Sequence, residues 1–438
     1  MQVDHSRAEP KLDLMFKKKK PEVLVVGAGP VGLFTALLLA RSGIRVQIID
    51  EAWHSATRSY ALMLHADTLR LMSEVDLRTP IEAMAYRIER IGFYDAERRR
   101  HELRLTDLTG PDPFVAALPQ RFLESVLIEA LEHQGVQVQW NHRLSRIEAR
   151  DDHVGVVIDT LEKDSVGYGI AHTEWVVRSR HSNEIPFVIG ADGHRSLVRR
   201  QLDIEFDEVG PPQHFAVFEF VSDARLGREM RVMLAPNHSG VLWPLPNGSC
   251  RFSFELLGDD LPLDTRQKNR LEVDVGLARF PVIEKDRLHQ YIEERAPWFK
   301  AAIGEIHWRM AVRFEKRLAR KFGKGRVGLI GDAAHMAGPV GGHSMNVGIR
   351  EGAALAHILL DIRENRENLQ ALEAYADERQ EEWKFLHGLT GGLAPTDRTD
   401  PWIAGEAARV LSTIPASGDA LLQLADQIGL VPNKTHSA

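Results

Sequence analysis

The sequence is poor in cysteine and carries no excess of positive charge. The 438 residues include one cysteine, Cys250, so no disulfide can form within the chain, and this favours a reducing compartment such as the cytoplasm. The net charge of −7 gives no general basic field of the kind that binds nucleic acid. The HExxH, paired CxxC and GxSxG motifs are absent, which excludes the usual zinc hydrolase and serine hydrolase patterns.

No long apolar run is free of helix-breaking residues. The most apolar stretch, residues 23–40, follows four lysines at 17–20 and superficially resembles a secretion signal or membrane anchor. Three glycines and a proline lie near its middle, where a membrane-spanning helix would have to be continuous. We therefore predict no transmembrane segment, a cytoplasmic location, and a disordered basic tail over residues 1–20.

Apolar periodicity predicts an α/β chain in which two kinds of sheet alternate along the sequence. Strand and helix patterns alternate near both ends and again between about 121 and 190, as in a parallel sheet covered by helices. The segments 214–256 and 304–320 hold strands without intervening helices, which predicts an antiparallel sheet. Residues 153–158 are predicted as a strand, which a polar stretch to about 183 follows. Two more helices are expected in the last fifty residues.

A glycine-rich motif lies between the first predicted strand and helix. In GAGPVG, Gly27 permits a tight turn, Gly29 permits close approach to a pyrophosphate, and Gly32 permits close helix–strand packing. The helix start then presents unpaired N–H groups to phosphates. Asp50 lies 23 residues after Gly27, where an acid binds an adenosine ribose. The combination predicts dinucleotide binding without distinguishing NAD from FAD.

A second strand–turn–helix pattern far downstream favours a flavin. Residues 326–334 (RVGLIGDAA) form a predicted buried strand that runs into Gly331 and Asp332. An aspartate at the end of a strand can hydrogen-bond the ribityl chain of a flavin. The following loop, which contains Pro339, Gly341 and Gly342 and is called the flavin loop below, precedes a helix. The first N–H groups of that helix stabilise negative charge, such as that at the N1–C2=O edge of a reduced flavin.

With these motifs the sequence resembles the class A flavoprotein monooxygenases, the aromatic hydroxylases with the para-hydroxybenzoate hydroxylase fold. GAGPVG, the mid-chain GADGHRSLVR at 190–199 and the GDAAH…PxGG…N element match in order, and the resemblance covers about 22–385. It implies an α/β fold with two interleaved domains and a C-terminal helical cap. The Rossmann-like FAD-binding domain would comprise 21–75, 110–205 and 321–384, the antiparallel β-sheet substrate-binding domain 76–109 and 206–320, and the cap 385–438.

The resemblance also implies roles for individual residues. His343 is a candidate proton relay in the flavin loop, beside Pro339, although a solvent-facing loop position is the simpler alternative. No metal site is expected, because His335 has no ligand-spaced partner and is interpreted as a structural hydrogen-bonding residue. The candidate substrate contacts, for which ordinary sheet core is the alternative, are Phe220, Trp243 and Pro244. The expected FAD contacts are Gly27, Gly29, Pro30, Val31, Gly32, Asp50, Glu51, Arg58, Gln120, Asp192, Gly331, Asp332, Pro339, Gly341, Gly342 and Asn346.

The resemblance implies a hydroxylase. NAD(P)H would reduce FAD, O₂ would add at the flavin C4a carbon, and the resulting hydroperoxide would hydroxylate an electron-rich, aromatic or polyketide-like molecule. The protein would be a monomer or homodimer without nucleic-acid partners. A dehydrogenase or ring-rearranging oxidoreductase of the same fold is an alternative. A flavin-binding protein without turnover is another, because Ser344 stands where the family commonly has Gly, and Glu351-Gly352 where it has Asp-Ala.

Overall fold

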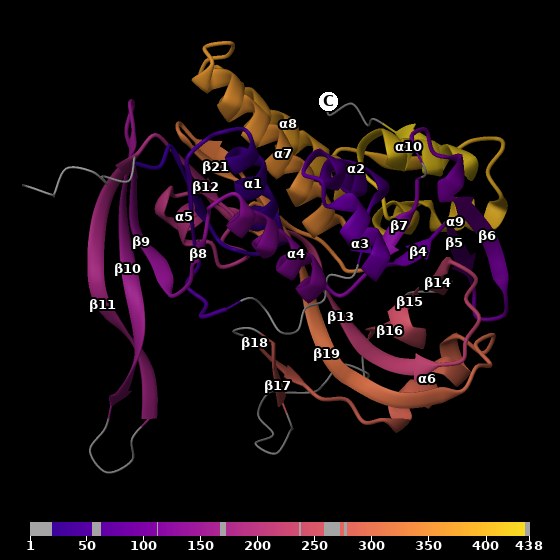
Figure 1. The fold of residues 1–438 in the computed structure, drawn as a ribbon. Helices are drawn as coiled ribbons and strands as arrows, with labels where there is room; N and C mark the ends of the chain where they lie inside the picture. Colours follow the sequence, from indigo (N-terminus) through magenta and orange to yellow (C-terminus); the bar gives the residue numbers. More distant parts are fainter. Residues whose placement is uncertain are drawn as a thin grey trace, which may run out of the picture.

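The computed structural model describes residues 20–54, 63–111, 113–166, 172–235, 238–257, 272–275 and 278–433. Three larger sheets, of six, eight and three strands, form the frame of the protein (Figure 1). Of the predicted basic tail, only Lys20 falls within the described residues. No helix in the described part of the chain has both the length and the apolar character needed to cross a membrane.

The six-stranded sheet is the parallel sheet predicted around the glycine-rich motif. Its strands lie in the order β20-β21-β12-β1-β2-β8, and every neighbouring pair is parallel except β20–β21. Such a sheet is covered on both faces, which explains why β1 is an unbroken, fully buried apolar run. The strands are β1 (Val23–Val26), β2 (Val46–Ile49), β8 (Val138–Gln139), β12 (Phe187–Gly190), β20 (Gly323–Lys324) and β21 (Val327–Leu329).

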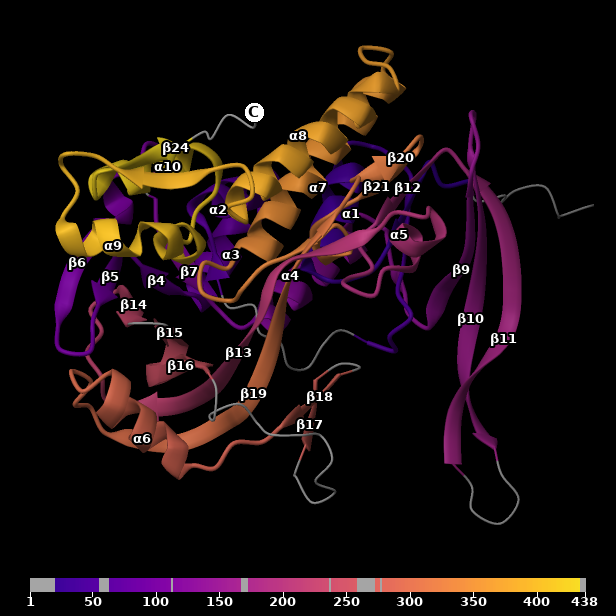
Figure 2. The ribbon, with the colours of Figure 1, turned by 180° about the vertical axis from the view of Figure 1, so that it is seen from behind.

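Four helices accompany this sheet. α1 (Pro30–Arg41) packs against both α4 (Gln120–His133) and α7 (His343–Arg363), and α7 runs beside α8 (Gln370–Leu386) in both views (Figures 1 and 2). The contact between α1 and α7 is close. A β-carbon at Gly352 would lie 2.0 Å from the hydroxyl oxygen of Thr35, so the usual alanine of the motif does not fit here.

The three-stranded antiparallel sheet stands beside the six-stranded one (Figure 1). It comprises β9 (His142–Ala149), β10 (Val154–Val166) and β11 (His172–Ile185). Most of the polar stretch 159–183, for which no element was predicted, is strand. Beyond Thr160 the β10–β11 ribbon has no β9 partner, its side chains are largely exposed, and cross-strand pairs such as Glu162–Arg178 (3.2 Å) link the two strands.

The eight-stranded sheet is the predicted antiparallel one, in the order β22-β19-β13-β16-β15-β14-β5-β6 with a single parallel pair, β5–β14. One face is covered by α6 (Asp286–Arg295) over a cluster of aromatic side chains, and the other face joins the main core. The strands are β5 (Arg90–Tyr94), β6 (Arg99–Arg104), β13 (Phe206–Ser222), β14 (Glu229–Ala235), β15 (His238–Pro244), β16 (Ser249–Leu256), β19 (Ile303–Ala319) and β22 (His335–Met336).

Shorter elements connect the large sheets. A small sheet in the order β3-β7-β4 pairs a strand of the predicted substrate domain, β4, with two strands of the predicted FAD domain. The domain boundaries stay a prediction. These elements are β3 (Met63–Leu64), β4 (Tyr86–Ile88), β7 (Val115–Ala117), β17 (Glu272–Val275), β18 (Ala278–Pro281), α2 (Ala66–Glu74), α3 (Arg78–Met84) and α5 (Leu197–Gln201).

The C-terminal segment contains the two expected helices, α9 (Pro401–Val410) and α10 (Gly418–Gln427). It also contains an antiparallel pair that was not predicted, β23 (Gly392–Pro395) with β24 (Leu430–Asn433). The segment lies near the edge of the eight-stranded sheet that ends in β5 and β6 (Figure 2). Arg409 fixes it there by donating to the backbone oxygen atoms of Ala235 and His238.

Candidate functional site

The three sequence motifs meet at the carboxyl edge of the six-stranded sheet. Strands β1, β12 and β21 are neighbours, and Val26 lies opposite Gly190, which in turn lies opposite Leu329. Each motif follows one of these strands, so the turns after residues 26, 190 and 329 stand side by side. Ligands of open α/β sheets bind at this edge.

The turn between β1 and α1 has the geometry of a phosphate-binding loop. Gly27 has φ +108°, and a β-carbon there would lie 2.2 Å from the backbone oxygen of Ala191. A β-carbon at Gly32 would lie 2.0 Å from the oxygen of Gly27, whereas nothing lies within 4 Å of the corresponding position at Gly29. Gly29 therefore faces open space at the start of α1, which Pro30 begins, and this space suits a pyrophosphate.

The predicted ribose-binding acid lies beside this turn. The Asp50 carboxylate accepts hydrogen bonds from the backbone N–H of Ala28 (2.6 Å) and of Ala52 (2.8 Å). These bonds fix the carboxylate next to the glycine turn, while Glu51 points to solvent. Arg58, the other predicted contact in this region, lies outside the described residues.

The mid-chain motif organises the site through its own side chains. Asp192 accepts hydrogen bonds from Ser196 Oγ (2.5 Å) and from two backbone N–H groups at the start of α5. Arg199 is buried and donates to the backbone oxygens of His194 and of Ala333, the latter at 2.8 Å. Arg199 thus ties the second motif to the third. Cofactor contact by Asp192 stays a prediction, since its carboxylate oxygens already hold α5.

Asp332 is the carboxylate that the site presents. It lies in a single 3₁₀ turn, η4 (Gly331–Ala333), directly after β21, and its side chain is exposed. Surrounding protein restricts its hydration and raises the pKa of the carboxyl group, while the nearby His335 and His194 oppose that rise. An exposed carboxylate at the carboxyl edge of the sheet is suited to accept hydrogen bonds from the hydroxyl groups of a ribityl chain.

The flavin loop is held by residues that reach it from elsewhere in the chain. Asn346 accepts from the backbone N–H of His65 and donates to the backbone oxygens of Met63 and Gly342, each at 2.8–3.0 Å. His65 also contacts the oxygen of Gly341 through Nε2 (2.8 Å). No sequence motif pointed to His65. Asn346 was predicted to line the flavin ring, but its amide is engaged by these backbone groups.

His343 is buried rather than solvent-facing. Its Nε2 lies 3.0 Å from the backbone oxygen of Ile414 and 3.1 Å from that of Ala416, both in the C-terminal segment. Burial lowers its pKa to about 4, so the ring is neutral at pH 7 and donates to these oxygens. The structure therefore places His343 between the flavin loop and the C-terminal segment; the solvent-facing alternative is wrong, and the proton relay stays a prediction.

The candidate substrate contacts do not share one face of the eight-stranded sheet. Phe220 belongs to the aromatic cluster under α6, with its ring 6.2 Å from that of Phe299. Trp243 lies on the opposite face, within the main core, and the alternation of β15 points the next residue, Pro244, away from it. Phe220 and Trp243 therefore lie in different core clusters, and substrate contact by Phe220, Trp243 and Pro244 stays a prediction. Trp243 is the one on the face that joins the flavin loop.

The remaining predicted contacts occupy compatible positions. Gln120 begins α4 and donates to Glu124 (2.6 Å), Val31 packs against Gly331, and Pro339 is half-buried in the loop. His335 accords with its interpretation as a structural residue, because it is buried and bonded to Glu351 at 2.8 Å.

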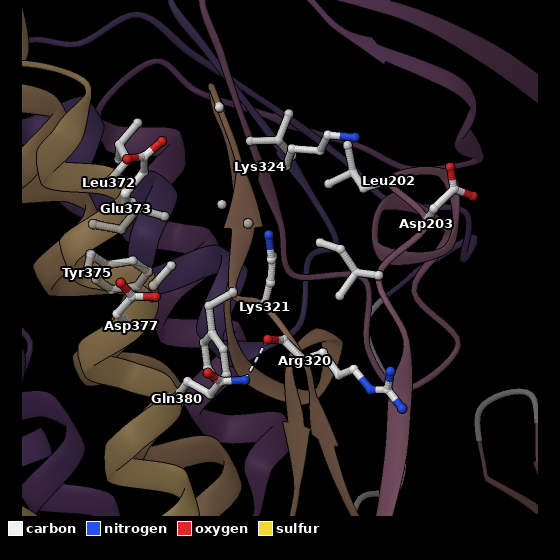
Figure 3. Close-up of a pocket in the computed structure, with 18 of the residues that line it drawn as sticks. Leu202, Asp203, Arg320, Lys321, Lys324, Leu372, Glu373, Tyr375, Asp377 and Gln380 are labelled. Carbon is white, nitrogen blue, oxygen red and sulfur yellow. Dashed lines mark hydrogen bonds between the residues drawn. The ribbon is translucent and has the colours of Figure 1, made fainter.

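A separate cavity of about 610 Å³ lies elsewhere, between α8 and the β20–β21 hairpin. Lys321 points its amine into it, and Gln380 of α8 donates to the backbone oxygen of Arg320 (Figure 3). The lining contains none of the predicted site residues, so it is distinct from the site described above.

Comparison with known proteins agrees with this geometry. A 6-methylpretetramide 4-monooxygenase from Streptomyces rimosus is 29% identical over 82% of this chain and 59% of its own length. A 3-(3-hydroxy-phenyl)propionate/3-hydroxycinnamic acid hydroxylase from Mycobacterium sp. (strain KMS) is 24% identical over 92% of this chain and 65% of its own. The chain therefore spans less than two thirds of the length of these relatives.

A solved structure supports the fold. The p-nitrophenol 4-monooxygenase of Pseudomonas putida DLL-E4 superposes with a TM-score of 0.67 over 93% of both chains at 20% identity. The model of the FAD binding domain family matches residues 20–385, a range that contains all three motifs. The open space at Gly29 and the exposed carboxylate of Asp332 fit the pyrophosphate and ribityl parts of FAD, and the chain belongs to the FAD binding domain family.

Proposed function

We propose that the protein is an FAD-dependent monooxygenase that uses NAD(P)H and O₂ to hydroxylate an electron-rich aromatic or polyketide-like small molecule. The names of the relatives support this class of reaction, since they are a monooxygenase of 6-methylpretetramide and a hydroxylase of hydroxyphenylpropionate. FAD, when bound, supplies hydride acceptance and oxygen activation. The protein supplies binding, orientation and a dry environment.

One observation carries the proposal: the flavin loop is joined to the eight-stranded sheet. His335 of β22 pairs with Leu318 of β19. A β-carbon at Gly338 would lie 2.6 Å from the amide oxygen of Gln213 on β13, so the sheet packs directly against the backbone of this loop. A flavin ring held beside Pro339 would then face a second sheet suited to holding a substrate.

The residues of the chain have separable roles in this reaction. The start of α1 beside Gly29 binds the pyrophosphate, and Asp332 orients the ribityl chain. His343 and the C-terminal segment close the loop from behind and exclude water. Because His343 is neutral at pH 7 and its Nε2–H is directed to backbone oxygens, its role in the proposed reaction is to orient the loop.

The departures from the family motif support an intact site rather than one that has lost turnover. The Ser344 hydroxyl oxygen accepts a hydrogen bond from the backbone N–H of Ala337 at 3.0 Å and so closes the loop. Gly352 makes room for Thr35. Both substitutions therefore have structural partners, and neither leaves a gap beside the cofactor.

The visible absorbance spectrum of the purified protein is the first test. We expect a flavin band that bleaches when NADPH or NADH is added together with phenolic or polycyclic aromatic candidates, and ¹⁸O from ¹⁸O₂ in the product. An oxidised product without ¹⁸O would favour a dehydrogenase or ring-rearranging enzyme. A bound flavin that no donor reduces with any candidate would contradict the proposal.

Two exposed acids, Asp332 and Glu51, provide a matched control for this test. Asp332→Asn should lose most of the bound FAD, because Asp332 supplies the exposed carboxylate proposed to bind the ribityl chain. Glu51→Gln, at a solvent-exposed position next to Asp50, should keep the flavin band. Equal loss of flavin in both variants would remove the support for this cofactor site.

A further inference from the structure

Glu351 is a buried carboxylate that none of the predicted cofactor contacts includes. It lies in α7 with no exposed surface. Its Oε2 accepts hydrogen bonds from the backbone N–H of Gly331 (2.9 Å) and from His335 Nε2 (2.8 Å), and its Oε1 accepts from Trp383 Nε1 (2.8 Å). Three donors from three separate elements thus converge on one side chain.

The charge state of Glu351 follows from these contacts. Burial alone would raise its pKa, but His335 and the hydrogen bonds from Gly331 and Trp383 lower it below the ordinary value for glutamate. The side chain is therefore ionised at neutral pH. A buried ionised carboxylate is tolerated only where its partners are in place, so the positions of these groups depend on one another.

The backbone contact is the one that reaches the cofactor site. Gly331 begins η4, and the next residue is Asp332. A β-carbon at Gly348, one helical turn before Glu351, would lie 2.9 Å from Gly331 Cα. The turn therefore rests directly on α7, and Glu351 fixes it there through the Gly331 N–H group.

The other two contacts extend this anchor to α8. Trp383 is fully buried, and its ring stacks on that of His335 with centroids 3.8 Å apart and an interplanar angle of 19°. Glu351, His335 and Trp383 thus form one packed unit behind the turn. This unit links α7 and α8 to the strand end that presents Asp332.

We propose that Glu351 is the positioning residue of the cofactor site: it holds η4 so that Asp332 stays exposed at the carboxyl edge of the sheet, and its buried negative charge sets the electrostatic environment of bound FAD. The inference rests on the proposed function only as far as FAD binding and does not require hydroxylation. A negative charge behind the ribityl end opposes the gain of electrons by the flavin, so its removal makes bound FAD easier to reduce.

Three variants test the proposal: Glu351→Gln, which keeps the shape and an acceptor oxygen but removes the charge; Glu351→Asp, which keeps the charge with a shorter reach; and Trp383→Phe, which removes one donor only. For each protein, the dissociation constant of FAD, the midpoint potential of bound FAD and the thermal midpoint of the apoprotein are measured. The potential and the FAD affinity are readouts that a purely structural role would not move together.

We expect Glu351→Gln to weaken FAD binding by about tenfold, because the turn loses its charged anchor, and to shift the midpoint potential to more positive values. Glu351→Asp should keep the potential near that of the unchanged protein while weakening FAD binding. Trp383→Phe should lower the thermal midpoint without moving the potential. If Glu351→Gln does not fold, the FAD affinity and midpoint potential of Glu351→Asp and Trp383→Phe still test the inference.

Two results would overturn the inference. One is a Glu351→Gln protein with lower stability but unchanged FAD affinity and potential. The other is a potential shifted in Trp383→Phe or Glu351→Asp although both retain the charge. These outcomes differ from a failure of the proposed function, in which the unchanged protein itself binds no FAD or forms no oxygenated product.

Discussion

The junction between the flavin loop and the C-terminal segment should make the protein sensitive to acid. His343 is 3% exposed, and burial lowers its pKa from 6.5 to about 4. Between these values the unfolded chain binds a proton at this residue and the folded chain does not. The stabilisation is therefore complete above pH 6.5 and is lost as the pH falls towards 4. At about 1.4 kcal/mol for each pKa unit, the full effect amounts to about 3 kcal/mol.

The assay compares the unchanged protein with His343→Gln, whose amide can still donate to the oxygens of Ile414 and Ala416 but does not titrate. Free energies of unfolding in urea are measured at pH 7.5 and pH 5 for both proteins. We expect the unchanged protein to lose roughly 2 kcal/mol more than the variant over this interval. The double difference cancels the titration of distant groups. The same loss in both proteins would refute the reasoning, since the acid sensitivity would then lie elsewhere.

Two further predictions concern glycine and serine positions of the motifs. Gly32→Ala should destabilise the fold by about 1–3 kcal/mol, because its β-carbon would lie 2.0 Å from the Gly27 oxygen. Gly29→Ala should leave thermal unfolding unchanged, because its β-carbon would meet nothing within 4 Å, but it should weaken FAD binding in a fluorescence titration. The reverse order of effects would contradict the assignment of Gly29 to the pyrophosphate. Ser344→Gly should lower the free energy of unfolding by about 1 kcal/mol through loss of the hydrogen bond from Ala337, while the flavin absorbance persists. A flavin-free Ser344→Gly protein would show instead that the hydroxyl is needed for cofactor binding.

The parts of the fold that the sequence predicted are those set by local patterns. The β1–α1–β2 unit follows from apolar runs interrupted by glycines at fixed spacing: a strand at about 22–27, a helix at about 30–42 and a strand at about 45–50 were predicted, and each is present to within a residue or two. The strand at 153–158, whose Val154, Val156 and Ile158 are buried, was predicted, whereas the outer part of the β10–β11 ribbon was missed because its side chains are largely exposed and show no apolar periodicity. Its stability comes from pairing across the hairpin, which composition does not reveal.

The substrate side was predicted less well for a different reason. Alternation along β13 and β15 identifies two faces but does not say which face is covered by α6 and which joins the flavin loop. That choice depends on segments distant in the sequence, so the alternation did not reveal that Phe220 and Trp243 lie in different core clusters. His65 was missed for the same reason, since its partner Gly341 lies 276 residues away.

Motif residues in this protein divide into those that hold the site and those that face the cofactor. The side chains of Asp192 and Asn346 form hydrogen bonds with backbone groups of the protein. By contrast, Gly29 faces open space and the side chain of Asp332 is exposed. A motif match alone does not separate the two groups, because both are needed for the same loop geometry. Loss of FAD after substitution of a holding residue therefore reports a displaced backbone, and only substitutions such as Asp332→Asn test direct contact with the cofactor.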